Sequence, residues 1–198
     1  MSLRTSYTLL APIYDRMVAA ATQAARRASL ARLPADARQV LLVGAGTGLD
    51  FPLLPAGPQY TAIDLTPAML DRARPRAAAR PELAIELRSG DALALDFADA
   101  SFDAVILHLI VAVVPDATRA LAEAARVLNP GGRALLYDKF LRPGQSAPLR
   151  RLLSPLLGRI ASRTDVVLEH HLPPTLRVLE DEASLAGGWF RRVLLERV

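Results

Sequence analysis

The sequence predicts an α/β protein built on a doubly wound, mostly parallel sheet. From Gln39 onward, short apolar runs typical of buried strands alternate with helical stretches. A glycine-rich turn at residues 44–48 follows the first of these runs. The chain has 198 residues, 52% of them hydrophobic, which suits one domain with a full-sized core.

Each predicted element has a local signal. Apolar or β-branched runs predict strands at 39–43, 59–64, 83–88, 102–108 and 133–138. Thr66-Pro67 begins a helix that Pro81 ends near Arg80, and Pro115-Asp116 begins another that ends near Leu128. Residues 175–182 and 189–197 flank Gly187-Gly188 as a closing antiparallel hairpin, which brings the sheet to seven strands. Residues 3–33 read as one or two helices.

Several function classes are excluded or disfavoured by composition. The chain has no cysteine, which excludes disulfides, thiolate metal sites and cysteine nucleophiles, and no residue spacing indicates a metal. The longest apolar stretch, residues 104–114, is shorter than the roughly 20 residues that span a bilayer. The N-terminal residues contain no signal-peptide pattern, so we expect a cytoplasmic protein.

Positive charge is concentrated outside the predicted core. Residues 139–163 hold Lys139 and five arginines and no acidic residue. Six large aliphatic side chains within 149–160 share one helical stripe, and Arg150, Arg151, Arg159 and Arg163 lie off it. Such a basic amphipathic helix can lie on an anionic membrane surface, and we predict this for 149–163. The alternative is a lid helix whose leucines face the core.

The glycine-rich turn and Asp64 predict a nucleotide-like ligand. In a doubly wound sheet the ligand lies beyond the carboxyl ends of the strands. Glycines there let the backbone approach the ligand closely. Asp64 closes the second predicted strand, where a carboxylate can accept both hydroxyls of a ribose. The dinucleotide fingerprint is incomplete, because Leu49 occupies the place of its last small residue.

Five segments in order resemble the class I methyltransferases that use S-adenosylmethionine, which have a Rossmann-like fold. They are residues 40–48, 60–70, 90–92, 101–106 and 126–132. The resemblance implies S-adenosylmethionine as cofactor, with Asp91 on the adenine amino group. The implied cofactor-binding residues are Gly44, Ala45, Gly46, Thr47, Gly48, Asp64, Leu65, Met69, Asp91, Ala92, His108 and Tyr14. Leu42 departs from the family, which usually has an acid there, and Asp50 is a candidate substitute.

The segments outside this core point to the acceptor. Residues 7–15 are similar to the N-terminal segment of quinone C-methyltransferases and small bacterial phospholipid N-methyltransferases. In those relatives the segment folds over the cofactor with tyrosines facing the site, which makes Tyr7 and Tyr14 catalytic candidates. Both could instead be packing aromatics. His108 ends the fourth strand near the transferring methyl and is the third catalytic candidate, although a hydrogen-bonded core histidine is the alternative.

We therefore predict one methyltransferase domain over 1–198. It comprises an N-terminal helical cap (1–38), a cofactor-binding core (39–138), a basic lid or membrane-surface segment (139–173) and the hairpin (174–198). The leading acceptor is the amine of a phosphatidylethanolamine-type lipid, reached from the inner face of the cell membrane. The same-class alternative is C- or O-methylation of a quinone precursor or another small hydrophobic metabolite. A dinucleotide-dependent reductase and a catalytically silent membrane-binding module are the rivals from other classes, and no nucleic-acid partner is expected.

Overall fold

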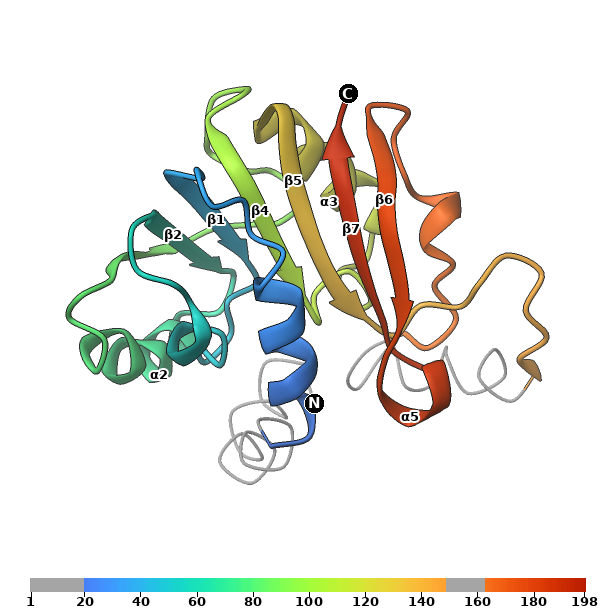
Figure 1. The fold of residues 1–198 in the computed structure, drawn as a ribbon, viewed down its shortest axis with the longest axis horizontal. Helices are drawn as coiled ribbons and strands as arrows, with labels where there is room; N and C mark the ends of the chain where they lie inside the picture. Colours follow the sequence, from blue (N-terminus) through green and yellow to red (C-terminus); the bar gives the residue numbers. More distant parts are fainter. Residues whose placement is uncertain (1–19, 149–162) are drawn as a thin grey trace.

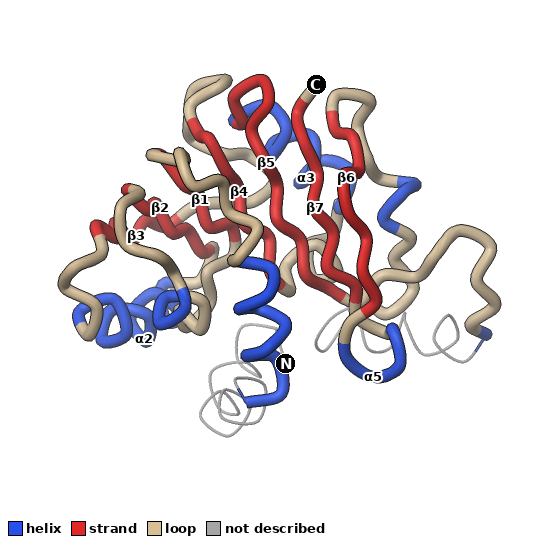
Figure 2. The backbone as a smooth tube through the Cα atoms, viewed as in Figure 1, coloured by secondary structure: helices blue, strands red, loops and turns tan. Residues whose placement is uncertain are grey.

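A twisted seven-stranded sheet forms the centre of the protein (Figure 1, Figure 2). The computed structural model describes residues 20–148 and 163–198. The strand order is β3-β2-β1-β4-β5-β7-β6. Strands β1 to β5 are parallel, whereas β7 is antiparallel to both β5 and β6. The bounds are β1 Gln39–Val43, β2 Gln59–Asp64, β3 Ala84–Ser89, β4 Phe102–His108, β5 Leu128–Asp138, β6 Leu176–Ala183 and β7 Arg191–Arg197.

The predicted fold class is confirmed, and most predicted strands are close to the observed ones. β1, β2 and β4 have the predicted bounds, and β3 begins and ends one residue later than predicted. β5 begins at Leu128 rather than Arg133, because the chain already pairs with Phe102 there, before a register shift. The predicted hairpin is present as β6 and β7, with the short helix α5 (Leu185–Gly188) in its connection.

Helices cover the two faces of the sheet. Helix 20–30 and α2 (Pro67–Ala78) lie on one face, and α3 (Ala117–Val127) covers the other (Figure 1). Leu30 packs in one apolar cluster with Val40, Leu42 and Ile106, whereas α3 packs in the other with Leu41 and Val105. This alternation along the strands is the two-residue period of a sheet that is buried on both faces. The 3-10 turns η1 (Phe51–Leu53) and η2 (Leu168–His170) complete the described elements.

The carboxyl ends of the parallel strands meet at one edge of the sheet, at the lower side of Figure 1. β6 runs parallel to β5, because both pair antiparallel with β7, so the β6–β7 connection lies at this edge too. We call it the carboxyl edge. No helix in the described part of the chain is long and apolar enough to cross a membrane.

Candidate active site

The turn after β1 is a left-handed glycine loop with one open face. Gly44, Gly46 and Gly48 have φ of +68°, +55° and +80°, a region that favours glycine. A Cβ on Gly44 would lie 2.6 Å from the Ile110 side chain, and a Cβ on Gly48 would lie 2.6 Å from the Phe51 ring. A Cβ on Gly46 would meet nothing within 4 Å. The loop is therefore packed at both ends and accessible in its middle, as a close-approaching ligand requires.

Asp64 joins this loop to the end of β2. Its carboxylate accepts hydrogen bonds from the backbone N–H of Gly46 at 2.9 Å and of Thr66 at 2.8 Å. Burial raises the pKa of Asp64 above its usual value, and the two N–H bonds oppose that rise. An ionised carboxylate has about four lone-pair sites, so Asp64 can accept further bonds from a ligand hydroxyl. Leu65, the next residue, is 54% exposed, and Met69 follows in the first turn of α2.

Asp91 and Ala92 lie just beyond the end of β3. The Asp91 carboxylate accepts a hydrogen bond from the N–H of Leu93 at 2.9 Å, which shapes a tight turn closed by an Asp91–Ala94 bridge. Ala92 is buried. The residues predicted to bind the cofactor thus lie at the ends of the three adjacent strands β1, β2 and β3, within 44–48, 64–69 and 91–92. The structure brings these segments together on the carboxyl edge.

His108, at the end of β4, belongs to a buried polar network. Its Nδ1 lies 2.9 Å from Asp50 Oδ1, and its Nε2 lies 2.9 Å from Ser29 Oγ. Arg26 Nη1 donates to the other oxygen of Asp50 at 2.9 Å, and Arg26 Nε donates to Thr22 Oγ1 at 3.0 Å. We call these five residues the helix–loop network. All five are buried, and they connect helix 20–30 to the glycine loop and β4.

The charges and hydrogen bonds of this network hold Asp50 in its ionised form. Burial alone would raise the pKa of Asp50, but the charges of His108 and Arg26 and their hydrogen bonds lower it well below its usual value. Asp50 is therefore an ionised acceptor at neutral pH, so His108 Nδ1 carries a proton and donates it to Asp50. In the tautomer with its only proton on Nδ1, Nε2 is the ring nitrogen that can accept from the hydroxyl of Ser29.

Asp50 was a candidate substitute for the acid missing at Leu42, and the structure gives it other partners. Both of its oxygens are engaged, by His108 and by Arg26. The Leu42 side chain is buried among apolar residues. Ser29 contacts His108, which contacts Asp50, and this sequence of contacts is the one found in a hydrolase triad. Here Ser29 is a buried residue of a helix and Asp50 is shared with Arg26, so the arrangement is not a hydrolase triad, and we interpret Ser29, Asp50 and Arg26 as structural support.

The loop after β4 is held in a strained conformation. Leu109 has φ +60°, which is uncommon for a residue with a Cβ and is often found at functional sites. Its N–H donates to the Tyr137 carbonyl at 2.7 Å, and the N–H of Ala112 donates to the buried carboxylate of Asp138 at 2.9 Å. These bonds place Ile110 against Gly44.

Tyr137 lies beside His108 at the end of β5. The two rings meet edge to face with centroids 6.0 Å apart, and Tyr137 stacks on Phe190 at 5.5 Å. The Tyr137 hydroxyl is buried and has no hydrogen-bond partner in the described part of the chain. Burial raises the pKa of this hydroxyl to about 12, so it stays protonated.

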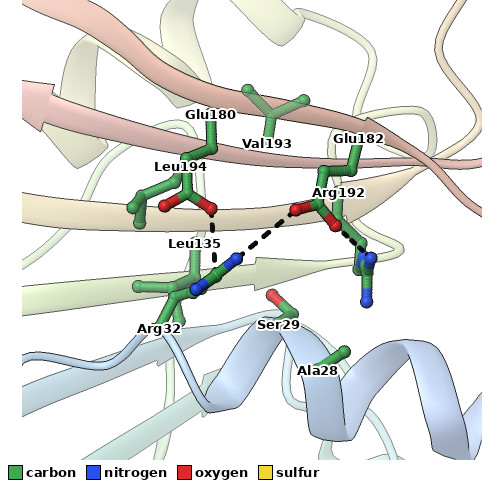
Figure 3. A pocket seen from close by; sticks show the side chains of 9 residues that line it. All are labelled: Ala28, Ser29, Arg32, Leu135, Glu180, Glu182, Arg192, Val193 and Leu194. Atoms are coloured by element: carbon green, nitrogen blue, oxygen red, sulfur yellow. Dashed lines mark hydrogen bonds and ion pairs between the residues drawn. The ribbon is translucent and has the colours of Figure 1, made fainter.

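A small charged cavity is lined by Ser29 but by no residue of the glycine loop. It lies between the end of helix 20–30 and strands β5, β7 and β6 (Figure 3). Its charged lining consists of two arginines and two glutamates that pair with one another: Arg32, Arg192, Glu180 and Glu182. Its volume is about 20 Å³, which holds a water molecule rather than a methyl acceptor. We therefore place the active site at the glycine loop and not in this cavity.

Some predicted site residues lie outside the described part of the chain. Tyr7 and Tyr14 belong to residues 1–19, and all but the last residue of the basic segment 149–163 falls in residues 149–162. Arg26 and Ser29, in contrast, are site-supporting residues that the sequence reasoning missed. Their partners are 24 and 79 residues away in the sequence, so no local pattern identifies them.

Comparison with known proteins agrees with this geometry. Residues 41–136 match the family model described as a methyltransferase domain. The chain is 34% identical to a phosphatidylethanolamine N-methyltransferase of Cereibacter sphaeroides over 188 residues, 93% of each chain. It is 40% identical to a ubiquinone/menaquinone biosynthesis C-methyltransferase of Dinoroseobacter shibae over 163 residues, 78% of this chain and 65% of that one. A Haloferax volcanii methyltransferase solved with its activator Trm112 shares the fold, with a TM-score of 0.77, 18% identity and coverage of 99% and 97%.

The chain belongs to the class I methyltransferase family. It is an S-adenosylmethionine-dependent methyltransferase, and its relatives include both phospholipid N-methyltransferases and quinone C-methyltransferases. The open face of Gly46 and the spare acceptor capacity of Asp64 fit a ligand that carries a ribose. S-adenosylmethionine, when bound, supplies a methyl group activated by a sulfonium.

Proposed function

We propose that this methyltransferase acts on the amine of a phosphatidylethanolamine-type lipid. The observation that carries the proposal is the end-to-end similarity to the Cereibacter sphaeroides enzyme, which spans 93% of both chains. The similarity therefore extends beyond the predicted cofactor core of residues 39–138. The quinone relative from Dinoroseobacter shibae is more identical but over a shorter part of its own length, 65%.

The carboxyl edge supports an amphipathic acceptor. Three of its exposed side chains are large and apolar: Leu65 after β2, Val113 after β4 and Trp189 in the β6–β7 connection, at 54%, 42% and 46% exposure. The basic segment 139–163 leaves the sheet at the same edge, from the end of β5. Exposed apolar side chains at the edge where a basic segment of the sequence begins suit a lipid whose head group is anionic or zwitterionic. We therefore propose a peripheral position on the cytoplasmic face of the membrane.

For the donor, we propose the residues that the family resemblance implies. The backbone of Gly44, Ala45, Gly46, Thr47 and Gly48 would border the methionine part, and Asp64 would accept the ribose hydroxyls. Leu65, Met69, Asp91 and Ala92 would border the adenine. Tyr14 and His108 would lie towards the sulfonium.

For the reaction, the residues would act mainly by positioning and by excluding water. The attacking amine must be neutral, so a proton has to leave it. We propose His108 as the group that takes this proton, with Tyr7 and Tyr14 holding the acceptor. Nε2 is the only ring nitrogen of His108 that can accept, and the Ser29 hydroxyl has to turn away from it first.

The second candidate is C- or O-methylation of a quinone precursor or another small hydrophobic metabolite. The 40% identity to a quinone C-methyltransferase specifically favours it. A quinone ring would use the same exposed apolar side chains, so the edge alone does not separate the two acceptors.

One assay separates these functions. Purified protein and methyl-labelled S-adenosylmethionine are mixed with anionic liposomes that contain phosphatidylethanolamine, with liposomes that lack it, or with liposomes that carry a demethylated quinone. We expect label in the lipid extract only with phosphatidylethanolamine. Label in the quinone sample alone would replace the lipid proposal by the second candidate. Cofactor binding without label in any sample would contradict both.

A further inference from the structure

We propose that Arg26 and Ser29 are positioning residues for the cofactor loop, so that docking of helix 20–30 and binding of the methyl donor are coupled. The inference rests on the S-adenosylmethionine-dependent activity and not on the identity of the acceptor. Its structural basis is the helix–loop network, in which Arg26 contacts Asp50 just after the loop and Ser29 contacts His108, the other partner of Asp50.

The network has its contacts at the point where the glycine loop ends. Asp50 follows Gly48 by two residues, and the Phe51 N–H donates to the Gly48 carbonyl at 3.1 Å. The Phe51 ring is fully buried, and its nearest carbon lies 2.6 Å from the place that a Cβ on Gly48 would occupy. Any displacement of Asp50 therefore moves Phe51 and the last glycine of the loop.

The loop is held from two sides. On one side Asp64 binds the N–H of Gly46, and on the other side Asp50 is bound by Arg26 and His108. Leu42 leaves the loop without the acid that the family usually has at the end of the first strand. Helix 20–30 therefore provides a support for the loop from outside the core.

Stability alone is a weak reason for such a network. Removing charges from water is expensive, and well-packed apolar residues of similar volume are often as stabilising as a buried ion pair. Arg26 and Asp50 are both buried, with side chains 8% exposed, and their pairing fixes one geometry of helix and loop. A defined geometry at a cofactor loop is the property that a methyl transfer needs.

The coupling predicts the effect of changes in the helix on donor binding. Binding of the donor orders the loop, and the loop orders the helix through Asp50, so each event favours the other.

The test measures the Kd of S-adenosylmethionine by calorimetry and the melting temperature of each variant by circular dichroism. Arg26→Met removes the charge and keeps much of the stem, and Ser29→Ala removes one hydroxyl while favouring the helix. We expect about a tenfold rise in Kd for Arg26→Met and a threefold or larger rise for Ser29→Ala, a normal range for coupled sites. Arg26→Lys should recover part of the affinity.

Two controls separate positioning from general stability. Arg191 is as buried as Arg26 and is paired with Glu169 and Asp181, but it does not contact the loop. Arg32 lies after the same helix and pairs with Glu180 and Glu182. Arg191→Met and Arg32→Met should leave Kd within twofold even where they lower the melting temperature.

The proposal is overturned if Ser29→Ala and a folded Arg26→Met both bind the donor within twofold of the unchanged protein. It is overturned as well if Arg191→Met weakens donor binding as much as Arg26→Met, because loss of stability would then explain the effect. If Arg26→Met does not fold, Ser29→Ala and Arg26→Lys decide: unchanged Kd in both contradicts the proposal, and raised Kd supports it.

Discussion

His108 Nδ1 and Asp50 Oδ1 lie 2.9 Å apart although 58 residues separate them in the sequence. The pair connects the end of β4 with the end of the glycine loop. Arg26 completes the charge balance from helix 20–30. The contact explains why an aspartate just after the glycine loop is fully engaged and why a histidine stands at the end of a buried strand.

The pair predicts an acid-sensitive contribution to folding. The pKa of Asp50 is lowered in the folded protein, so its ionised form stabilises the fold at pH above its unfolded pKa of about 3.9. That contribution is lost as the pH falls towards the lower, folded value. Asp50→Asn should therefore cost about 3 kcal/mol at pH 6 and progressively less below pH 4. Urea unfolding at several pH values measures the difference between the two proteins.

Asp71→Asn is the control for this prediction, because Asp71 pairs with Arg74 on the surface. Its effect should be small at every pH. A cost of Asp50→Asn that stays constant down to pH 3 would show that its charge does not stabilise the fold.

The open face of Gly46 predicts a selective loss of donor binding. Gly46 and Gly131 have φ of +55° and +76°, and a Cβ on either would meet nothing within 4 Å. Alanine at each position should cost about 1 kcal/mol through backbone strain. Gly46→Ala should also weaken binding of S-adenosylmethionine, by a factor on the order of ten or more, because Gly46, unlike Gly131, lies in the proposed donor site. Gly131→Ala should leave that binding unchanged. Equal Kd values for the two variants in calorimetry would be evidence against this site.

Packing of Ile110 against Gly44 predicts a different outcome for the neighbouring glycine. Gly44→Ala should destabilise the fold more than Gly46→Ala, because its Cβ would lie 2.6 Å from the Ile110 side chain. The double variant Gly44→Ala/Ile110→Ala removes the two nearest Ile110 carbons and leaves the Ile110 Cβ at 2.9 Å, so it relieves part of the overlap and should cost less than the sum of the two single variants. Denaturant unfolding of the four proteins tests this. Strictly additive costs would mean that the Ile110 contact does not limit the side chain at residue 44.

Tyr60 and Tyr137 allow a comparison of how much a buried tyrosine hydroxyl contributes to the free energy of unfolding with and without a hydrogen-bond partner. Burial raises the pKa of both Tyr60 and Tyr137 to about 12. Tyr60 donates to the Pro55 carbonyl at 2.7 Å, whereas the Tyr137 hydroxyl has no partner in the described residues. Tyr60→Phe should therefore lose about 1 kcal/mol of unfolding free energy, and Tyr137→Phe should lose none or gain slightly. A larger loss for Tyr137→Phe would reveal a partner for its hydroxyl.

The proposed role of His108 predicts a split between catalysis and binding. Asn at 108 can still donate to Asp50 through its amide, but it has no group equivalent to Nε2. His108→Asn should therefore lower kcat by about 100-fold or more, while the Kd of S-adenosylmethionine rises only as much as in Ser29→Ala, which loses the same hydrogen bond. A kcat within threefold of the unchanged protein would make His108 a support for the loop and not the proton acceptor.

The sequence predicted the sheet well because its strand signals are local. β1 and β4 are apolar runs bounded by turn residues or charges, and their bounds are as predicted. The predicted start of β5 was wrong. The residues of Asn129-Pro130-Gly131-Gly132 are typical of turns and predict a strand that begins after them. In the structure, tertiary pairing of Leu128 with Phe102 extends the strand through these residues.

Part of the candidate site could be inferred from the sequence. The carboxyl-edge residues were found through ordered motifs, and the structure places Gly46 and Asp64 in direct contact. The helix–loop network was not found. Arg26 lies in a stretch rich in alanine and arginine, where a buried arginine looks like any surface one, and only the packing of the helix on the sheet identifies its partner.

Hydrogen–deuterium exchange with and without S-adenosylhomocysteine tests the central claim most directly, namely that the carboxyl edge holds the donor and is supported by helix 20–30. The account predicts slower exchange of backbone amides in residues 44–50, 64–69 and 91–93, and also in helix 20–30, which the helix–loop network connects to the donor site through Asp50 and His108. Unchanged exchange in 44–50 and 64–69, or protection confined to β6 and β7, would contradict it.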